Sequence, residues 1–316
     1  MNFSFISIVS VINSSEDVSR VEQYLPKLHH LLTANFNDFE IILVNNTLDT
    51  DIFNDQLDRN ESTKNHRYII NLSKQIDENN AIVAGLDQAN GDYVIFLEPD
   101  FFATPDIMLQ LYSTAQQNFD IVYLSSAQKT TGLTRKILLN TFYFLMRRYS
   151  GLRIDPNAYN SRIISRRAIH SILKLRENMR YMKAIYSLVG YRTTSVEVNP
   201  PLKKMRAKFF DELKMAVIAL TSFTNLLGVL LLWIFMFSIV LFFGVSANAV
   251  MVKLLGKDIF GHPQAEVTGW AFLVILISMT FAILCLILYI MSIYLSNIYR
   301  EIKQRPLYII ESIRRV

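Results

Sequence analysis

The 316-residue chain has an excess of apolar residues, although its first two hundred residues carry charges at an ordinary globular density. Hydrophobic residues make up 51% of it and charged residues 19%, and the mean hydropathy is +0.25. This length suits one sizeable domain with an appendage. Since Cys285 is the only cysteine, a disulfide framework and a thiolate metal site are both excluded. The net charge of +5 comes without an arginine-rich or zinc-finger pattern, so nucleic acid is not an expected partner.

Strand-like and helix-like patterns alternate through the first 124 residues. Apolar, β-branched runs predict strands over Phe5–Ile12, Glu40–Asn45, Tyr68–Leu72, Tyr93–Leu97 and Ile121–Leu124. Helical patterns cover Val18–Ala34, Asn79–Ala89 and Pro105–Gln116. This βαβ rhythm predicts an α/β domain with a mostly parallel sheet. Such a sheet binds its ligand at the carboxyl ends of its strands, where the chain places the polar segments Asn13–Glu16, Asn45–Asp49 and Glu98–Asp100.

Beyond Gly132 the pattern becomes helical. The segment Leu133–Tyr149 has apolar residues along one side and basic residues near both ends. Such a helix suits the membrane surface, but it equally suits packing on the sheet. Its proximity to two apolar segments favours the membrane surface.

Two long apolar segments occupy the last third of the chain. Neither Met215–Val252 nor Val267–Tyr299 contains Asp, Glu, Lys or Arg, and each exceeds the roughly 20 residues that cross a bilayer. We therefore expect two transmembrane helices, at about residues 220–244 and 270–294. The alternative, a pair of buried core helices, is disfavoured because Leu226–Phe243 lacks a polar stripe.

The distribution of basic residues predicts the orientation of these spans. Lysines and arginines precede the first span and follow the second, whereas the connecting loop balances its charges. Both termini are therefore expected in the cytoplasm, on a multi-pass protein of the inner (cytoplasmic) membrane. The predicted divisions are a core at 1–132, juxtamembrane helices that complete the domain at 133–214, the spans at 215–299, and a basic tail at 300–316.

The run AIVAGLDQANGDYVIFLEPD, residues 81–100, combines a helical stretch, a buried strand and a closing acidic motif. It resembles the part of the family-2 glycosyltransferases in which a helix leads through a buried strand to an Asp-x-Asp metal motif. Three further stretches resemble neighbouring parts of that family: DFEIILVNNTLDTD, RIISRRAIHSI and RYMKAIYSLVGYRTTSVEV. The tail YREIKQRPLYII resembles the C-terminus of the polyprenyl-phosphate glycosyltransferases.

The resemblance implies a GT-A fold that transfers a sugar, with inversion, from a nucleotide-diphosphate sugar to the phosphate of a membrane-embedded polyprenol. It also implies a Mg²⁺ or Mn²⁺ ion, and a homo-oligomer is one expected assembly. By this resemblance Glu98 and Asp100 bind the metal, and Asp100 and Arg162 serve catalysis. The donor would contact Asn13, Asn45, Asp49 and Lys74, and the acceptor phosphate would contact Lys203, Lys204 and Arg206.

The chain departs from the family pattern at several of these positions. Asn45 and Asn46 stand where an acidic pair is usual, and Asn160 stands where an aspartate precedes Arg162. An amide forms hydrogen bonds but carries no charge. Two alternatives remain open: Glu98–Asp100 is a turn that ends a strand, and the lysines and arginine at 203–206 are a positive flank of the first span.

Two functions follow from these observations. The first is a membrane glycosyltransferase acting on polyprenyl phosphate in surface-polysaccharide or lipid modification. The second is a degenerate relative that binds lipid or a partner protein as a scaffold, without turnover. A transporter is disfavoured because the two spans carry no intramembrane charge.

Overall fold

The fold is that of a computed structural model of the chain. It describes residues 3–47, 66–126, 133–152, 154–175, 181–198, 224, 226–257, 261, 269–303 and 306–315. The chain divides into two compact units, Met1–Ala219 with Gln304–Val316, and Leu220–Lys303.

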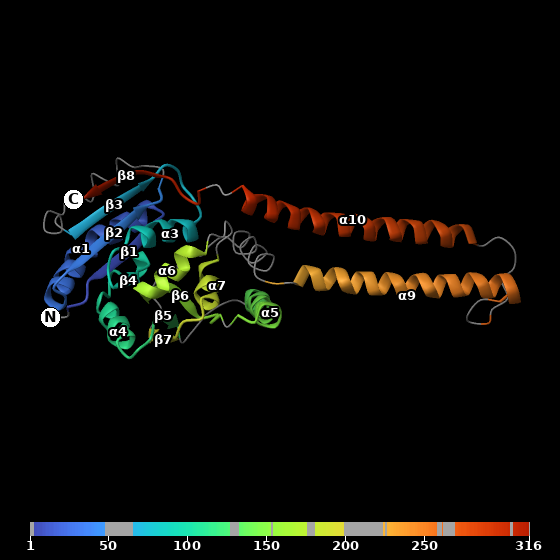
Figure 1. The fold of residues 1–316 in the computed structure, drawn as a ribbon, viewed down its shortest axis with the longest axis horizontal. Helices are drawn as coiled ribbons and strands as arrows, with labels where there is room; N and C mark the ends of the chain where they lie inside the picture. The colour runs from blue at the N-terminus through green and yellow to red at the C-terminus, as the bar shows by residue number, and fades with distance from the viewer. Residues whose placement is uncertain are drawn as a thin grey trace. The chain divides into compact units, whose positions relative to one another are not determined.

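A single sheet forms the centre of the first unit (Figure 1). Among the described residues eight strands join it, in the order β7-β5-β6-β4-β1-β2-β3-β8. They are β1 (Ile6–Ile12), β2 (Phe39–Asn45), β3 (Arg67–Leu72), β4 (Tyr93–Phe96), β5 (Ile121–Ser126), β6 (Ala158–Ser165), β7 (Thr193–Val198) and β8 (Ile310–Arg315). The pairs β1–β2, β1–β4, β2–β3 and β5–β7 are parallel, whereas β6 pairs antiparallel with β4 and β5, and β8 pairs antiparallel with β3. The predicted α/β domain with a mostly parallel sheet is confirmed.

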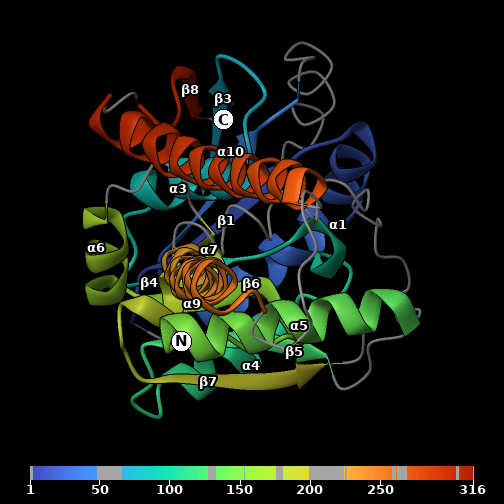
Figure 2. The same cartoon turned by 90° about the vertical axis from the view of Figure 1, so that its right-hand side faces the viewer.

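Helices cover both faces of this sheet. They are α1 (Ser15–Asn35), α3 (Glu78–Gln88), the 3-10 helix η2 (Pro99–Phe101), α4 (Asp106–Ala115), α5 (Leu133–Ser150), α6 (Arg166–Lys174) and α7 (Met182–Leu188). In Figure 2, α3 and α6 lie on one side of the sheet and α1 lies on the other. This is a three-layer arrangement, with the sheet in the middle.

The two faces follow from the alternation of side chains along a strand. Ile6, Ile8 and Ile12 of β1 belong to a buried cluster that includes residues of α1 and α4. Val9, which points the other way, lies against Gly85 of α3, where an added Cβ atom would overlap the Cγ1 atom of Val9. Glycine at position 85 therefore lets α3 pack closely on the sheet.

The helices and strands expected in the first 124 residues are all present, with boundaries that differ by at most three residues. Beyond Gly132 the sequence pattern predicts helices, whereas the structure also contains the strands β6 and β7 of the sheet, of which only β7 lies in a stretch that resembles a strand of the family. In β6 the polar residues Asn160, Ser161 and Arg162 interrupt the apolar run that usually identifies a buried strand. The tail expected at 300–316 also contributes a strand, β8, at the edge of the sheet.

The second unit contains α9 (Leu226–Leu255) and α10 (Gly269–Ile302), the long helices of Figure 1. Large apolar side chains on them are exposed, including Trp233 at 71% and Leu288 at 61%. In the described part of the chain, Met279–Ser296 is the one helical segment long and apolar enough to cross a membrane, and Gly228–Gly244 is a shorter apolar stretch. Of the two expected spans, the structure therefore supports the second, at Met279–Ser296, by length and composition. The first stays a prediction.

Candidate active site

Polar residues gather where β1, β2 and β4 end, as the sequence predicts. Asn13 follows β1, Asn45 closes β2, and Glu98 comes two residues after β4. Because β1 lies between β2 and β4 and runs parallel to both, these three ends lie at the same edge of the sheet. We refer to it as the carboxyl edge.

Asn46 ties three chain segments together at the carboxyl edge. Its Nδ2 atom donates to Oδ1 of Asn13 at 2.7 Å and to the carbonyl oxygen of Ile76 at 3.0 Å. Its Oδ1 atom accepts from the backbone N–H of Ile76 at 2.9 Å. An aspartate here would keep the bond from the N–H of Ile76 but could not donate the other two. The hydrogen bonds of Asn46 therefore explain why an asparagine stands where the family usually has an acidic residue.

Asn45 is buried, and its amide is engaged within the protein. Its Nδ2 atom donates to Oδ1 of Asn71 at 3.0 Å, and its Oδ1 atom accepts from the N–H and the hydroxyl of Thr47 at 3.0 and 2.7 Å. Asn71 in turn donates to Oγ of Ser312 on β8 at 3.0 Å. This chain of bonds links the end of β2 to the C-terminal strand.

The Glu98 carboxylate is held against β6. Its Oε2 atom accepts from the N–H of Asn160 at 3.1 Å, and from the N–H and hydroxyl of Ser161 at 3.2 Å each. The N–H of Glu98 donates to Oγ of Ser161 at 2.9 Å. The position of Glu98 is therefore fixed by β6, on the side of β4 opposite to β1.

Asp100 is ion-paired in the structure. Its Oδ1 atom contacts Arg20 of α1, which also pairs with Glu16 one turn earlier in the same helix. The side chains of Arg20 and Asp100 are about one quarter exposed. A cation binding Asp100 would compete with Arg20 for the carboxylate.

Glu98 and Asp100 suit a cation that binds together with a phosphate ligand. In the described part of the chain, no group of three or more His, Cys, Asp or Glu residues is placed to hold a metal. Mg²⁺ is commonly bound through only one or two carboxylates, with substrate phosphates and water completing its shell. The carboxylates of Glu98 and Asp100 match this ion in donor type and number, and both are engaged by protein groups in the structure.

Arg162 lies in the interior beside the carboxyl edge. It is 3% exposed, and its guanidinium donates to the carbonyl oxygens of Asn160 and Tyr159 at 2.8 Å each. Its Cζ atom lies 3.7 Å from the ring centroid of Tyr186. Burial lowers the pKa of Arg162 from its ordinary value, and nearby Tyr186 and Glu98 oppose this shift. These contacts support the fold around Glu98.

Two charged residues that sequence reasoning missed, Glu78 and Lys183, also lie at this edge. Burial among protein atoms, followed by the negative charge of Glu98, raises the pKa of Glu78 to about 7, and Lys183 opposes the shift. The Glu78 residue is nevertheless exposed to solvent at the start of α3, which limits this shift. Lys183 donates to the carbonyl oxygen of Ala158 at 2.5 Å. Glu78 directly precedes the helix expected at Asn79–Ala89, and Lys183 lies in a stretch singled out only by its family resemblance, so neither position carried a functional signal.

Lys74 is exposed and lines a hollow of about 340 Å³ next to the carboxyl edge. Residues of the loop after β3 and of the segment before β8 form its walls. The other predicted site residues, Asp49, Lys203, Lys204 and Arg206, lie outside the described residues.

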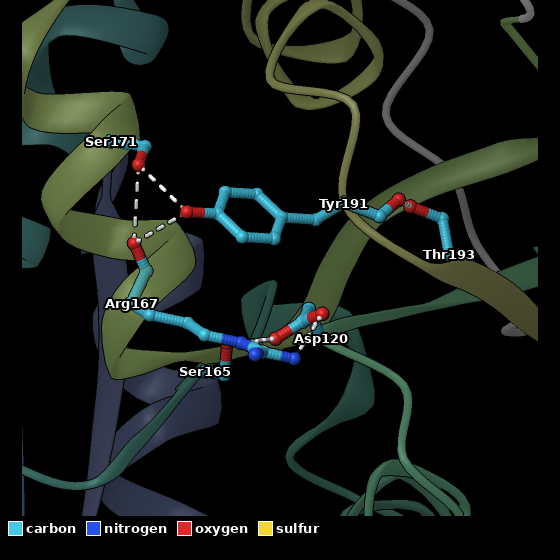
Figure 3. Close-up of polar contacts among 6 residues, drawn as sticks. All are labelled: Asp120, Ser165, Arg167, Ser171, Tyr191 and Thr193. Atoms are coloured by element: carbon cyan, nitrogen blue, oxygen red, sulfur yellow. Dashed lines mark hydrogen bonds and ion pairs between the residues drawn. The ribbon is translucent and has the colours of Figure 1, made fainter.

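A second polar network lies at the edge of the sheet opposite to the carboxyl edge, where β4 and β5 begin (Figure 3). Asp120 accepts from Ser165 at 2.8 Å and from Nη2 of Arg167 at 2.8 Å, and Tyr191 contacts Ser171 at 2.9 Å. Burial alone would raise the pKa of Asp120, but the hydrogen bonds from Arg167 and Ser165 outweigh it and hold the pKa low. A larger hollow of about 510 Å³ lies here and contains none of the predicted site residues. We interpret the network as the attachment of α6 and β7 to the sheet.

Comparison with known proteins identifies the family. The model of glycosyl transferase family 2 matches residues 8–173. The chain belongs to glycosyl transferase family 2. This family 2 glycosyltransferase is 27% identical to an uncharacterised glycosyltransferase of Synechocystis sp., over 98% of this chain and 95% of the relative.

Two further relatives of this family 2 glycosyltransferase have more informative names. A prophage-derived bactoprenol glucosyl transferase of Shigella flexneri is 27% identical, over 78% of this chain and 79% of the relative. An undecaprenyl-phosphate 4-deoxy-4-formamido-L-arabinose transferase of Photorhabdus laumondii is 23% identical, over 99% of this chain and 96% of the relative. The region matched to the family, 8–173, includes Asn13, Asn45, Glu98, Asp100 and Arg162, whereas β8 lies beyond it.

Proposed function

We propose that this glycosyltransferase moves a sugar from a nucleotide-diphosphate sugar to undecaprenyl phosphate or a similar polyprenyl phosphate. The observation that carries the proposal is the placement of Glu98 and Asp100 at the carboxyl edge of a GT-A-like sheet, in a chain that also carries long apolar helices. The names of the bactoprenol and undecaprenyl-phosphate relatives support the choice of acceptor.

The donor binds at the carboxyl edge in this proposal. Asn13, Asn45, Asp49 and Lys74 are assigned to the nucleotide, with Asn45 acting by shaping the end of β2 because its own amide is already bonded. Glu98 and Asp100 would hold Mg²⁺ or Mn²⁺, which when bound neutralises charge on the leaving diphosphate. Asp100 is released from Arg20 for this role.

The reaction needs little acid–base chemistry from the chain. An oxygen of the acceptor phosphate, already anionic at neutral pH, forms the new bond to the anomeric carbon of the sugar. The bond from that carbon to the diphosphate oxygen breaks, and the nucleoside diphosphate leaves with the electron pair. Lys203, Lys204 and Arg206 are assigned to the acceptor phosphate, which they would attract by charge. Arg162 keeps β6, and with it Glu98, in place.

We further propose that α9 and α10 both span the inner membrane, with both termini in the cytoplasm. The apolar composition of the two helices and the basic residues that flank them support this topology. The arrangement would present the polyprenyl phosphate to the cytoplasmic domain at the membrane surface.

A transfer assay with purified full-length protein tests the function. The protein is given undecaprenyl phosphate, Mg²⁺ or Mn²⁺, and a panel of radiolabelled nucleotide sugars, and lipid extracts are examined for labelled product. We expect one donor to yield a metal-dependent glycolipid. The absence of product from every donor, together with no nucleotide-induced thermal shift, would contradict the proposal.

A scaffold without turnover is the second candidate. The bonds that occupy Asn45 and the ion pair that occupies Asp100 favour it, since both engage groups that a donor site would use. The same assay separates the two candidates, because a scaffold forms no product with any donor.

A further inference from the structure

The hollow beside the carboxyl edge has two walls, which come from segments far apart in the chain. One wall comes from the loop after β3 and the start of α3, and the other comes from the segment between α10 and β8. The first contributes Lys74, Gln75, Ile76, Asp77 and Asn80, and the second contributes Pro306, Leu307, Tyr308 and Ile309. The second wall lies outside the region matched to the family.

The C-terminal wall is anchored to the sheet and to α3. The N–H of Ser73 donates to the carbonyl oxygen of Ile309 at 3.0 Å, where the pairing of β3 with β8 begins. The hydroxyl of Tyr308 donates to Oδ2 of Asp87 on α3 at 2.5 Å. These bonds place residues 306–309 at a defined position beside the loop after β3.

The two walls differ in chemistry. The loop wall is polar and carries the positive charge of Lys74, whereas the C-terminal wall is largely apolar, with one aromatic ring. A nucleobase has apolar faces and a polar edge, and it stacks on side chains of this kind. A volume of about 340 Å³ lies in the range of small-ligand sites.

Asn80 adds an independent sign of a ligand. It lines the hollow, and its Oδ1 atom is buried without a hydrogen-bond partner in the described part of the chain. Buried polar atoms of folded proteins nearly always have a partner. A donor group on a base edge, reached directly or after rotation of the amide, would satisfy Asn80.

We propose that Pro306–Ile309 form one wall of the donor site, and that this hollow binds the base of the nucleotide sugar between the C-terminal segment and Asn80. The inference rests on the proposed function and adds a part of the chain to it. Lys74, at the same hollow, would face the ribose or the first phosphate. The strand β8 then serves donor recognition by holding this wall in place.

Calorimetric titration of full-length protein in detergent with UDP, GDP, CDP and ADP tests the inference. Leu307→Ala and Asn80→Asp alter the hollow, and Ile313→Ala is the matched control on β8, where the side chain is 49% exposed and does not line the hollow. We expect each hollow variant to bind the diphosphate that wild type prefers about tenfold more weakly. In these variants the affinities for the four diphosphates should also differ less from one another. The control should match wild type in affinity and in base preference.

The outcomes separate the inference from the function on which it rests. If wild type binds a diphosphate and transfers sugar while both hollow variants keep its affinity and base preference, the base lies elsewhere and the inference is overturned. If wild type binds no diphosphate of the panel and transfers no sugar, the function itself fails and the inference fails with it. Asn80→Asp keeps the side-chain size, so an altered base preference at an unchanged melting temperature cannot come from misfolding.

Discussion

The hydroxyl of Tyr308 donates a hydrogen bond to Oδ2 of Asp87, which lies 221 residues earlier in the chain. Asp87, on α3, belongs to the stretch at residues 81–100 that resembles the family, and Tyr308 belongs to the stretch YREIKQRPLYII. Two stretches that carry the family resemblance, far apart in the chain, therefore meet in the structure. Residues that follow the apolar helices return to the sheet and become part of the catalytic domain.

Arg162→Lys should destabilise the domain. A lysine cannot keep both bonds to the carbonyl oxygens of Tyr159 and Asn160 while stacking on Tyr186. We expect the free energy of unfolding to fall by about 2 kcal/mol, measured by denaturant titration. Arg192→Lys, at an exposed arginine, is the control and should change little. Wild-type stability combined with complete loss of transfer would instead assign Arg162 to the chemistry.

The raised pKa of Glu78 predicts a pH dependence of stability in the absence of divalent cations. The native state keeps the proton up to about pH 7, whereas the unfolded chain loses it near the ordinary glutamate pKa of 4.5. Stability from this group is therefore fully present below pH 4.5 and is lost as the pH rises to about 7. Because Glu78 has access to solvent, we expect a loss of only about 1 kcal/mol.

Glu78→Gln tests that dependence, since glutamine stays neutral at every pH. At pH 8 in EDTA this variant should be more stable than wild type, and at pH 4 the two should agree. The control is Glu311→Gln, which removes an exposed carboxylate of β8 and should follow the wild-type curve. Parallel curves for Glu78→Gln and wild type would show that Glu78 titrates as an ordinary carboxyl group.

Arg20→Gln should strengthen cation binding. Removing the guanidinium frees Asp100 from its ion pair, and such a partly exposed pair is worth up to about 1 kcal/mol. We therefore expect Mn²⁺ to bind several-fold more tightly in the presence of UDP, measured by electron paramagnetic resonance of the free ion. Lys27→Gln, on the same helix, should leave Mn²⁺ binding unchanged. Weaker binding by Arg20→Gln would mean that Arg20 assists the ligand instead of competing with the cation.

The sequence was sufficient to predict the buried parallel strands and the edge at which the site lies. β1 and β2 are continuous apolar runs, and parallel pairing then brings Asn13, Asn45 and Glu98 to one edge without further information. The sequence pattern did not predict the edge strands β7 and β8. Both strands are only partly covered, so their sequences lack the continuous apolar run that identifies a buried strand.

The partners of the site residues could not be predicted from the sequence. Glu98 bonds to β6 and Asp100 pairs with Arg20, and both contacts join residues more than 60 positions apart. In the sequence, Asn46 indicates only that a negative charge usual in the family is missing. In the structure, its amide bonds to both Asn13 and Ile76. Side-chain direction depends on the assembled sheet, so spacing along the chain does not determine it.

The transfer of labelled sugar to undecaprenyl phosphate by Asp100→Asn, compared with Asp106→Asn, tests the central claim most directly. Asp106 is an exposed carboxylate at the start of α4, six residues after Asp100, so the two substitutions remove the same charge from neighbouring places. We predict that Asp106→Asn keeps the wild-type, metal-dependent transfer rate. The transfer rate of Asp100→Asn should be at least about 100-fold lower. Product formation by Asp100→Asn at the wild-type rate would contradict the assignment of this edge as the metal-assisted catalytic site.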